Sequence, residues 1–240
     1  MDSRITIQYR FIFPRQHEEL IEVVIDCRNM EAVSDIPAPA PDWCRLDFHQ
    51  CPNCPLDAGQ HADCPLALRL VRVIAASRNV ISYDEVGMEV TTPERTVTKH
   101  TTAQRALSSL MGLVMATSGC PHMAFFKPMA RYHLPLATEE ETIFRAVSTY
   151  LLEQYFLHKQ GRPVDLDLKG LKDIYTEIGK VNAAMAERLR AIRTEDSAIN
   201  AVVRLDLLAK ALPYSVEDSL EEIRYLFLNP AAESNGAASR

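Results

Sequence analysis

The sequence predicts an α+β protein in which N-terminal antiparallel β-hairpins and a cysteine-rich metal-binding loop precede a mainly α-helical C-terminal half. Three observations predict this class: apolar residues alternate near the N-terminus, cysteines cluster after residue 43, and apolar residues take helical spacing after residue 100. Because strands come early and helices late, rather than in alternating βαβ units, the pattern favours α+β over α/β.

Two hairpins are expected in the first half of the chain. Apolar residues alternate with polar ones over 5–13, which is typical of a strand with one buried face, and residues 21–25 suit the returning strand. A second hairpin joins 86–90 to 96–98 through a turn at Pro93-Glu94. Residues 34–42 form a proline-rich connector, which we expect to be extended.

The rest of the chain has helical spacing. One helix is expected through Leu68 to Ala75, and two more are opened by capping boxes at Thr101 with Gln104 and at Thr138 with Glu141. A long helix follows over 171–192, and then two shorter ones over 199–212 and 216–227, which Pro213 separates.

We expect one α+β domain over residues 1–228. It divides into a β-hairpin and proline-rich connector (1–42), a four-cysteine metal-site region (43–135) and a helical region (136–228). The small, polar residues 229–240 are expected to form a disordered tail.

The composition limits the function classes. The net charge of -6 argues against a nucleic-acid partner, because a general nucleic-acid binder carries a basic surface. Gln8 and Arg10 interrupt the N-terminal apolar residues, which argues against a signal peptide, and no apolar run reaches the ~18 residues of a membrane span. We therefore expect a cytoplasmic protein that contacts no membrane.

Four of the six cysteines are followed directly by proline, which suggests that they share one role: Cys51, Cys54, Cys64 and Cys120. Six cysteines in 240 residues are too few for a disulfide scaffold, and cytoplasmic thiols stay reduced. The spacing C-x2-C-x9-C-x55-C instead suggests a metal site with these four as ligands. Cys27 and Cys44 lack the proline. Cys27 is expected to be a small buried residue, and Cys44 could substitute for a ligand without support from its neighbours.

Four thiolates suit either tetrahedral zinc or an iron–sulfur cluster. Pro55 stands where a zinc knuckle often has glycine with positive φ, and it has no N–H to donate to a sulfur. Cysteine followed by proline also recurs in ferredoxin-type cluster ligation. The expected cofactor is therefore a four-iron, four-sulfur (4Fe-4S) cluster. Structural zinc is the alternative, and a thiol-redox or metal-free role is the remaining one.

Histidines and basic residues near the cysteines form a second candidate set for hydrogen bonds to the thiolates or for anion binding: His49, His61, His122, Lys127, Arg131 and His133. The histidines could enter a mixed Cys/His zinc site, but hydrogen bonds to thiolates or backbone are the simpler role. The basic segment after Cys120 could offset the negative charge of a cluster, bind an anion or lie solvated on a loop.

Two stretches resemble a bacterial family of uncharacterised proteins known only as a domain of unknown function: Leu46–Leu56 (LDFHQCPNCPL), and Ala116–Pro121 (ATSGCP) with Lys127–Pro135 (KPMARYHLP). The similarity covers roughly residues 3–212, and the Cys-Pro motifs are its most specific part. The resemblance implies that the four Cys-Pro cysteines are the family's cysteines and that a non-cysteine residue is usual where Cys44 stands. It implies no activity.

Three functions remain open. The leading hypothesis is a cytoplasmic iron–sulfur protein that senses redox state or transfers electrons, with an unknown protein or redox partner. The second is a zinc-stabilised protein-interaction module, and the third is a cluster-dependent enzyme with an anion pocket of Lys127, Arg131 and His133. The chain has no G-x-G-x-x-G, P-loop, H-E-x-x-H or G-x-S-x-G motif, so the sequence leans against an enzyme. The long amphipathic helix could support a homodimer.

Overall fold

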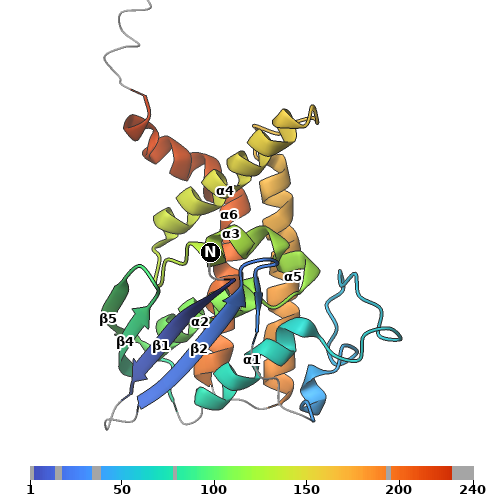
Figure 1. The fold of residues 1–240 in the computed structure, drawn as a ribbon, viewed down its shortest axis with the longest axis vertical. Helices are drawn as coiled ribbons and strands as arrows, with labels where there is room; N and C mark the ends of the chain where they lie inside the picture. Colours follow the sequence, from blue (N-terminus) through green and yellow to red (C-terminus); the bar gives the residue numbers. More distant parts are fainter. Residues whose placement is uncertain (1–2, 14–17, 34–38, 78–79, 193–195, 229–240) are drawn as a thin grey trace, which may run out of the picture.

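The fold consists of one antiparallel sheet and a set of helices that cover one of its faces and extend beyond it (Figure 1). The computed structural model describes residues 3–13, 18–33, 39–77, 80–192 and 196–228. The predicted tail and residues 34–38 of the proline-rich connector lie outside this part of the chain. The α+β class is confirmed.

Both predicted hairpins are present, and they join into one sheet of order β3-β2-β1-β4-β5. The strands are β1 (Arg4–Ile12), β2 (Glu18–Asp26), β3 (Glu31–Ala32), β4 (Glu85–Thr91) and β5 (Thr96–Thr102). Antiparallel pairing of β1 with β4, in a register that sets Tyr9 opposite Val90, connects the two hairpins.

The alternating residues of the strands form the sheet's buried face. Ile7, Tyr9 and Phe11 of β1 are almost fully buried, as are Met88 and Val90 of β4. This face packs against α1 (Pro65–Ala76) and α2 (Ala103–Ala116), which contact β2, β4, β5 and each other. The period-2 pattern therefore identified the correct buried side.

Four further helices follow α2, and two of the three short 3-10 helices, η2 and η3, lie beside Cys44 and Cys120. The helices are α3 (Lys127–Arg131), α4 (Glu139–Lys159), α5 (Lys169–Ala191) and α6 (Asp196–Glu222), and the 3-10 helices are η2 (Asp42–Cys44), η3 (Pro121–Phe126) and η4 (Arg224–Leu226). Helix α6 packs against α2, α4 and α5. No helix within the described ranges is long and apolar enough to cross a lipid bilayer.

Helix boundaries confirm one prediction and correct two. The capping box at Thr138 and Glu141 is complete, with both reciprocal hydrogen bonds present. The predicted box at Thr101 is wrong, because Thr101 is held in β5 opposite Val86 and the helix starts at Ala103.

The predicted break at Pro213 is also wrong, because α6 continues through it as one helix. Proline removes one backbone hydrogen bond, which ordinarily breaks or kinks a helix. Here Ala209, Leu212 and Val216, on either side of the proline, are all buried. Tertiary packing therefore holds the segment helical.

Candidate metal centre

Cys51 and Cys54 lie in a tight turn of the irregular segment between η2 and α1. The Cys54 amide donates to the Cys51 carbonyl oxygen at 3.0 Å, which closes the turn. Asn53, between them, donates from Nδ2 to the carboxylate of Glu177 on α5 at 2.7 Å. The Asn53 carbonyl also lies 2.7 Å from Nε2 of His122. The turn is therefore fixed to α5 and to the segment after Cys120, and Figure 1 shows this loop at the edge of the molecule beside α5.

Cys64 and Cys120 each occupy the position just before a helix. Cys64 is the N-cap residue of α1, and Pro65 opens the helix; Cys120 precedes η3, and Pro121 opens it. Proline suits the first helical position, because its missing N–H would have no partner there and its φ is already helical. These two Cys-Pro pairs therefore have a direct conformational reason, which differs from that of the pairs in the Cys51–Cys54 turn.

The four Cys-Pro thiols lie within electrostatic range of one another. Burial, and then the neighbouring Cys64, Cys120 and Cys54, raises the pKa of Cys51 to about 12. Burial likewise raises the pKa of Cys120 to about 11, with Cys64 and Cys54 adding to the shift. The backbone N–H groups of His122 and Met123, next along the chain, act in the opposite direction and lower the pKa of Cys120. Three separate segments thus bring the four thiols together, and their raised pKa values keep Cys51 and Cys120 protonated at neutral pH.

Spacing between these thiols matters for what they could bind. Across the described residues, no group of three or more His, Cys, Asp or Glu side chains is arranged to hold a single metal ion. The centre therefore consists of converging sulfur donors without closed single-ion coordination.

Cys44 is closer to this centre than its sequence context indicated. Its side chain is fully buried, and its carbonyl accepts the Cys64 amide at 2.7 Å. Burial raises the pKa of Cys44 to about 12, with Asp63 and Cys64 adding to the rise and Arg188 opposing it. The sequence does not show this proximity, because it depends on the antiparallel bridge between Arg45 and Asp63, which brings Cys44 beside Cys64.

Arg188 of α5 is a buried cation beside the cysteines that the sequence did not single out. It is 1% exposed, and its Nη1 donates to the carbonyl oxygens of Trp43 and, at 2.7 Å, Arg45. Its guanidinium carbon lies 5.7 Å from the centre of the Phe48 ring. Its positive charge acts to lower the pKa of both Cys44 and Cys51. Nε of Arg188 is buried and has no hydrogen-bond partner.

Of the three candidate histidines nearest the cysteines, His122 is the one that contacts the cysteine turn. His49 is exposed and packs edge-on against Phe48, with ring centres 4.9 Å apart. His61 is also exposed, and its backbone amide donates to the Asp57 carbonyl. The predicted set therefore divides into one histidine that joins two cysteine segments and two that lie at the surface.

The basic segment after Cys120 does not act as one cluster. Lys127 forms a 3.1 Å ion pair with Glu31, and Arg131 lies over the Tyr132 ring. His133 is directed elsewhere, with Nε2 hydrogen-bonded to the Tyr9 hydroxyl. Burial, and then the charge of Arg145, lowers the pKa of His133 to about 3, so this imidazole is neutral at physiological pH.

Comparison with known proteins identifies a family but no activity. A family model described as "Domain of unknown function (DUF6901)" matches residues 7–228. No curated protein and no solved structure matches the chain.

Proposed function

Because the chain belongs to the DUF6901 family, whose description assigns no activity, we propose a function from its residues: it is an iron–sulfur protein that binds a 4Fe-4S cluster through Cys51, Cys54, Cys64 and Cys120. The carrying observation is the convergence of these four thiols from three separate segments. Thiolates are the ligands that such clusters require.

Two features around the thiols support a bound anionic cluster rather than four free thiols. Four thiolates on a cluster core leave net negative charge, which hydrogen bonds to sulfur and nearby cations stabilise. The amides of His122 and Met123 favour a negative charge on the Cys120 sulfur, and Arg188 supplies a buried positive charge. A cubane is larger than one ion, so its four thiolates need not approach as closely as zinc ligands do.

The position of the thiols supports a redox role. Cys51, Cys54 and Cys120 are partly exposed, whereas Cys64 is buried. A centre near the surface can exchange electrons with a partner or react with oxidants. We therefore assign it electron transfer or redox sensing, with a protein redox partner.

Anaerobic purification tests the cofactor. The full chain should be brown and contain about four iron and four acid-labile sulfide per molecule. Cys51→Ser and Cys120→Ser should each lose most of both, whereas Cys27→Ser is the matched control outside the four and should keep them. A colourless protein with one zinc would overturn the cluster proposal.

Reduction tests the redox role. Dithionite should bleach the visible band, and controlled reoxidation should restore it if the centre transfers electrons. Breakdown of the band in air, together with altered folding or partner binding, would support sensing instead. A band that responds to neither reductant nor air would contradict both roles.

A zinc-stabilised interaction module is the second candidate, favoured by exposed apolar side chains on the helical half. Leu151, Leu152, Tyr155 and Phe156 of α4 are each more than a third exposed. In that case a chelator should unfold the cysteine region, and the partner should bind the same way under reducing and oxidising conditions. Retention of both fold and thiol protection without zinc would exclude this candidate.

A further inference from the structure

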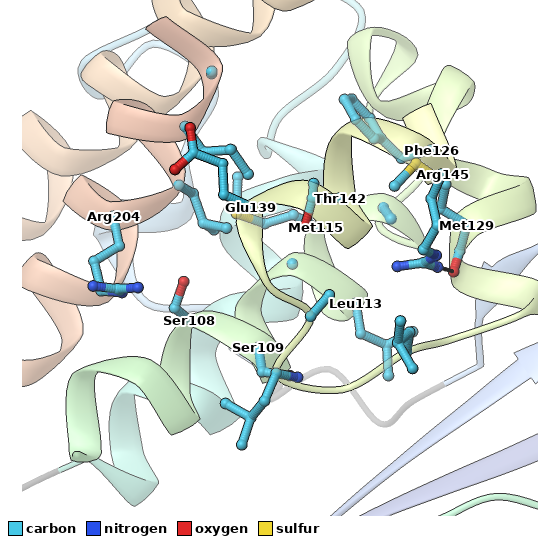
Figure 2. Close-up of a pocket in the computed structure, with 18 of the residues that line it drawn as sticks. Ser108, Ser109, Leu113, Met115, Phe126, Met129, Glu139, Thr142, Arg145 and Arg204 are labelled. Carbon is cyan, nitrogen blue, oxygen red and sulfur yellow. Dashed lines mark hydrogen bonds between the residues drawn. The ribbon is translucent and has the colours of Figure 1, made fainter. Parts of the chain in front are cut away.

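A cavity of about 450 Å³ lies away from the cysteines, among α2, the segment between α3 and α4, α5 and α6 (Figure 2). Its volume is in the range that holds small-molecule ligands. Most of its wall is apolar, formed by side chains from four helices: Leu113, Met115, Met129, Ile178, Leu205 and Leu208. The apolar body of a ligand would be desolvated here.

Three arginines interrupt this apolar wall. Arg105 of α2 and Arg204 of α6 are both solvent-exposed and are close enough for their charges to repel. Partial burial, and then the charge of Arg105, lowers the pKa of Arg204. In the described part of the chain, neither guanidinium forms an ion pair. Arg145 of α4 lies on another side of the cavity in Figure 2, where its Nη2 donates to the Met129 carbonyl at 2.7 Å.

The charge around the cavity is not balanced by carboxylates. Glu139 also lines the cavity, but it is one carboxylate against three arginines. His133, a further lining residue, is neutral at physiological pH because its pKa is lowered to about 3. An anion near Arg105 and Arg204 would therefore remove their mutual repulsion and gain charge-assisted hydrogen bonds.

Asn182 of α5 gives an independent indication that the cavity binds a ligand. It lines the cavity and is 1% exposed, yet its Oδ1 is buried without a hydrogen-bond partner. Buried polar atoms in folded proteins almost always have partners, because an unmade hydrogen bond costs free energy. A hydroxyl or N–H donor on a bound molecule would satisfy this oxygen.

We infer that the cavity is a binding site for a small anionic amphiphile, with a carboxylate head held by Arg105 and Arg204 and an apolar body against the helix walls. The Ser108 hydroxyl, drawn on the same side of the cavity as Arg204 in Figure 2, adds a donor for the head group. A donor on the ligand body pairs with Asn182. This proposal does not depend on what the four Cys-Pro cysteines bind.

Displacement of anilinonaphthalene sulfonate, a fluorescent anionic amphiphile, tests the site on the full chain. Decanoate should displace the dye, decanol of equal chain length should do so more weakly, and decyltrimethylammonium should not. Hydroxydecanoate should bind more tightly than decanoate, and Asn182→Leu should remove that difference. Equal binding of decanoate and decanol would overturn the proposed charge selectivity.

Charge variants locate the head group. Arg105→Gln and Arg204→Gln should each weaken decanoate about ten-fold or more, by loss of a charge-assisted hydrogen bond, while leaving decanol unchanged. Glu139→Gln should strengthen decanoate, because it removes a like charge from the wall. Arg95→Gln, in the turn between β4 and β5, is the matched control and should change nothing.

Thermal unfolding of each variant separates lost binding from lost fold. A folded Arg204→Gln protein that binds decanoate as the unaltered protein does would refute the site. Gly112→Leu adds a direct test of location, because Gly112 lines the cavity and a larger side chain there would fill it. If folded Gly112→Leu still binds both decanoate and decanol, the ligands bind elsewhere and the proposal fails.

Discussion

His133 should make the stability of this protein depend on pH in a defined direction. Its Nε2 accepts a hydrogen bond from the Tyr9 hydroxyl, because burial raises the pKa of Tyr9 and keeps that phenol protonated. The Tyr9 oxygen lies 3.0 Å from Oγ of Ser109, which in turn accepts the Leu136 amide at 3.0 Å. The resulting chain of hydrogen bonds requires an unprotonated Nε2, and the nearby Arg145 further disfavours the imidazolium.

The size of the effect follows from the pKa shift. The ordinary histidine pKa of 6.5 falls to about 3 in the fold, so below 6.5 the unfolded chain binds a proton that the folded chain does not. Above pH 6.5 this imidazole is neutral in both states and does not lower the free energy of unfolding. That free energy decreases as the pH falls from 6.5 toward 3. At about 1.36 kcal/mol for each pH unit, the loss between pH 7 and pH 5 is about 2 kcal/mol.

Urea unfolding of the unaltered protein and of His133→Gln, at several values between pH 7 and pH 5, measures this loss. The variant loses the Tyr9 hydrogen bond at every pH, which costs about 1 kcal/mol. The difference in unfolding free energy between the two proteins should therefore change by about 2 kcal/mol on acidification. The unaltered protein should be about 1 kcal/mol more stable than the variant at pH 7 and about 1 kcal/mol less stable at pH 5. His158→Gln, at an exposed site near the end of α4, is the matched control. A difference that stays constant from pH 7 to pH 5 would refute the neutral, buried His133.

Four further substitutions test the fold. Gly179→Ala should raise the unfolding free energy by about 0.5–1 kcal/mol, since a Cβ there first meets another atom at 4.0 Å. Gly170→Ala should lower it, because a Cβ there would clash with the Tyr150 hydroxyl, and equal effects of the two substitutions on thermal unfolding would contradict this contrast. Thr138→Ala should cost about 1 kcal/mol in urea unfolding by removing the capping box, and a neutral result would argue against that cap. Arg188→Met should cost about 2–4 kcal/mol, because the carbonyls of Trp43 and Arg45 lose their donor, and an unchanged urea midpoint would show that these bonds are absent.

Local patterns made part of this structure predictable. The alternation over β1 and the reciprocal Thr138–Glu141 pair involve residues within one element, so spacing alone identifies them. The errors arise where tertiary structure overrides local preference: strand pairing retains Thr101 in β5, and buried neighbours carry α6 through Pro213. Propensity is a weak constraint when packing opposes it.

The grouping of the four Cys-Pro cysteines was accessible to sequence reasoning for a different reason. Each of the four cysteines is followed directly by a proline, so a repeated dipeptide marks residues that lie far apart in the chain. No repeated sequence motif marks Arg188 or the residues around the cavity. Their proximity to one another depends on the packing of several helices, which spacing within one segment does not encode.

Helix α5 contributes residues to both the cysteine centre and the cavity, although its sequence shows only an apolar pattern. Its apolar residues were expected to form the core, and Leu171, Val181 and Leu189 are indeed buried. Tyr175, Ile178 and Asn182 follow one another at intervals of three and four, so they share a face, and all three line the cavity. Glu177 and Arg188 are eleven residues apart, close to three full turns, so they share another face, and both hold the cysteine segments. One core helix therefore supports the centre and the cavity on separate faces. The apolar spacing that predicts this helix carries no information about the polar residues that lie between the apolar ones. Neither site could therefore be located from that spacing.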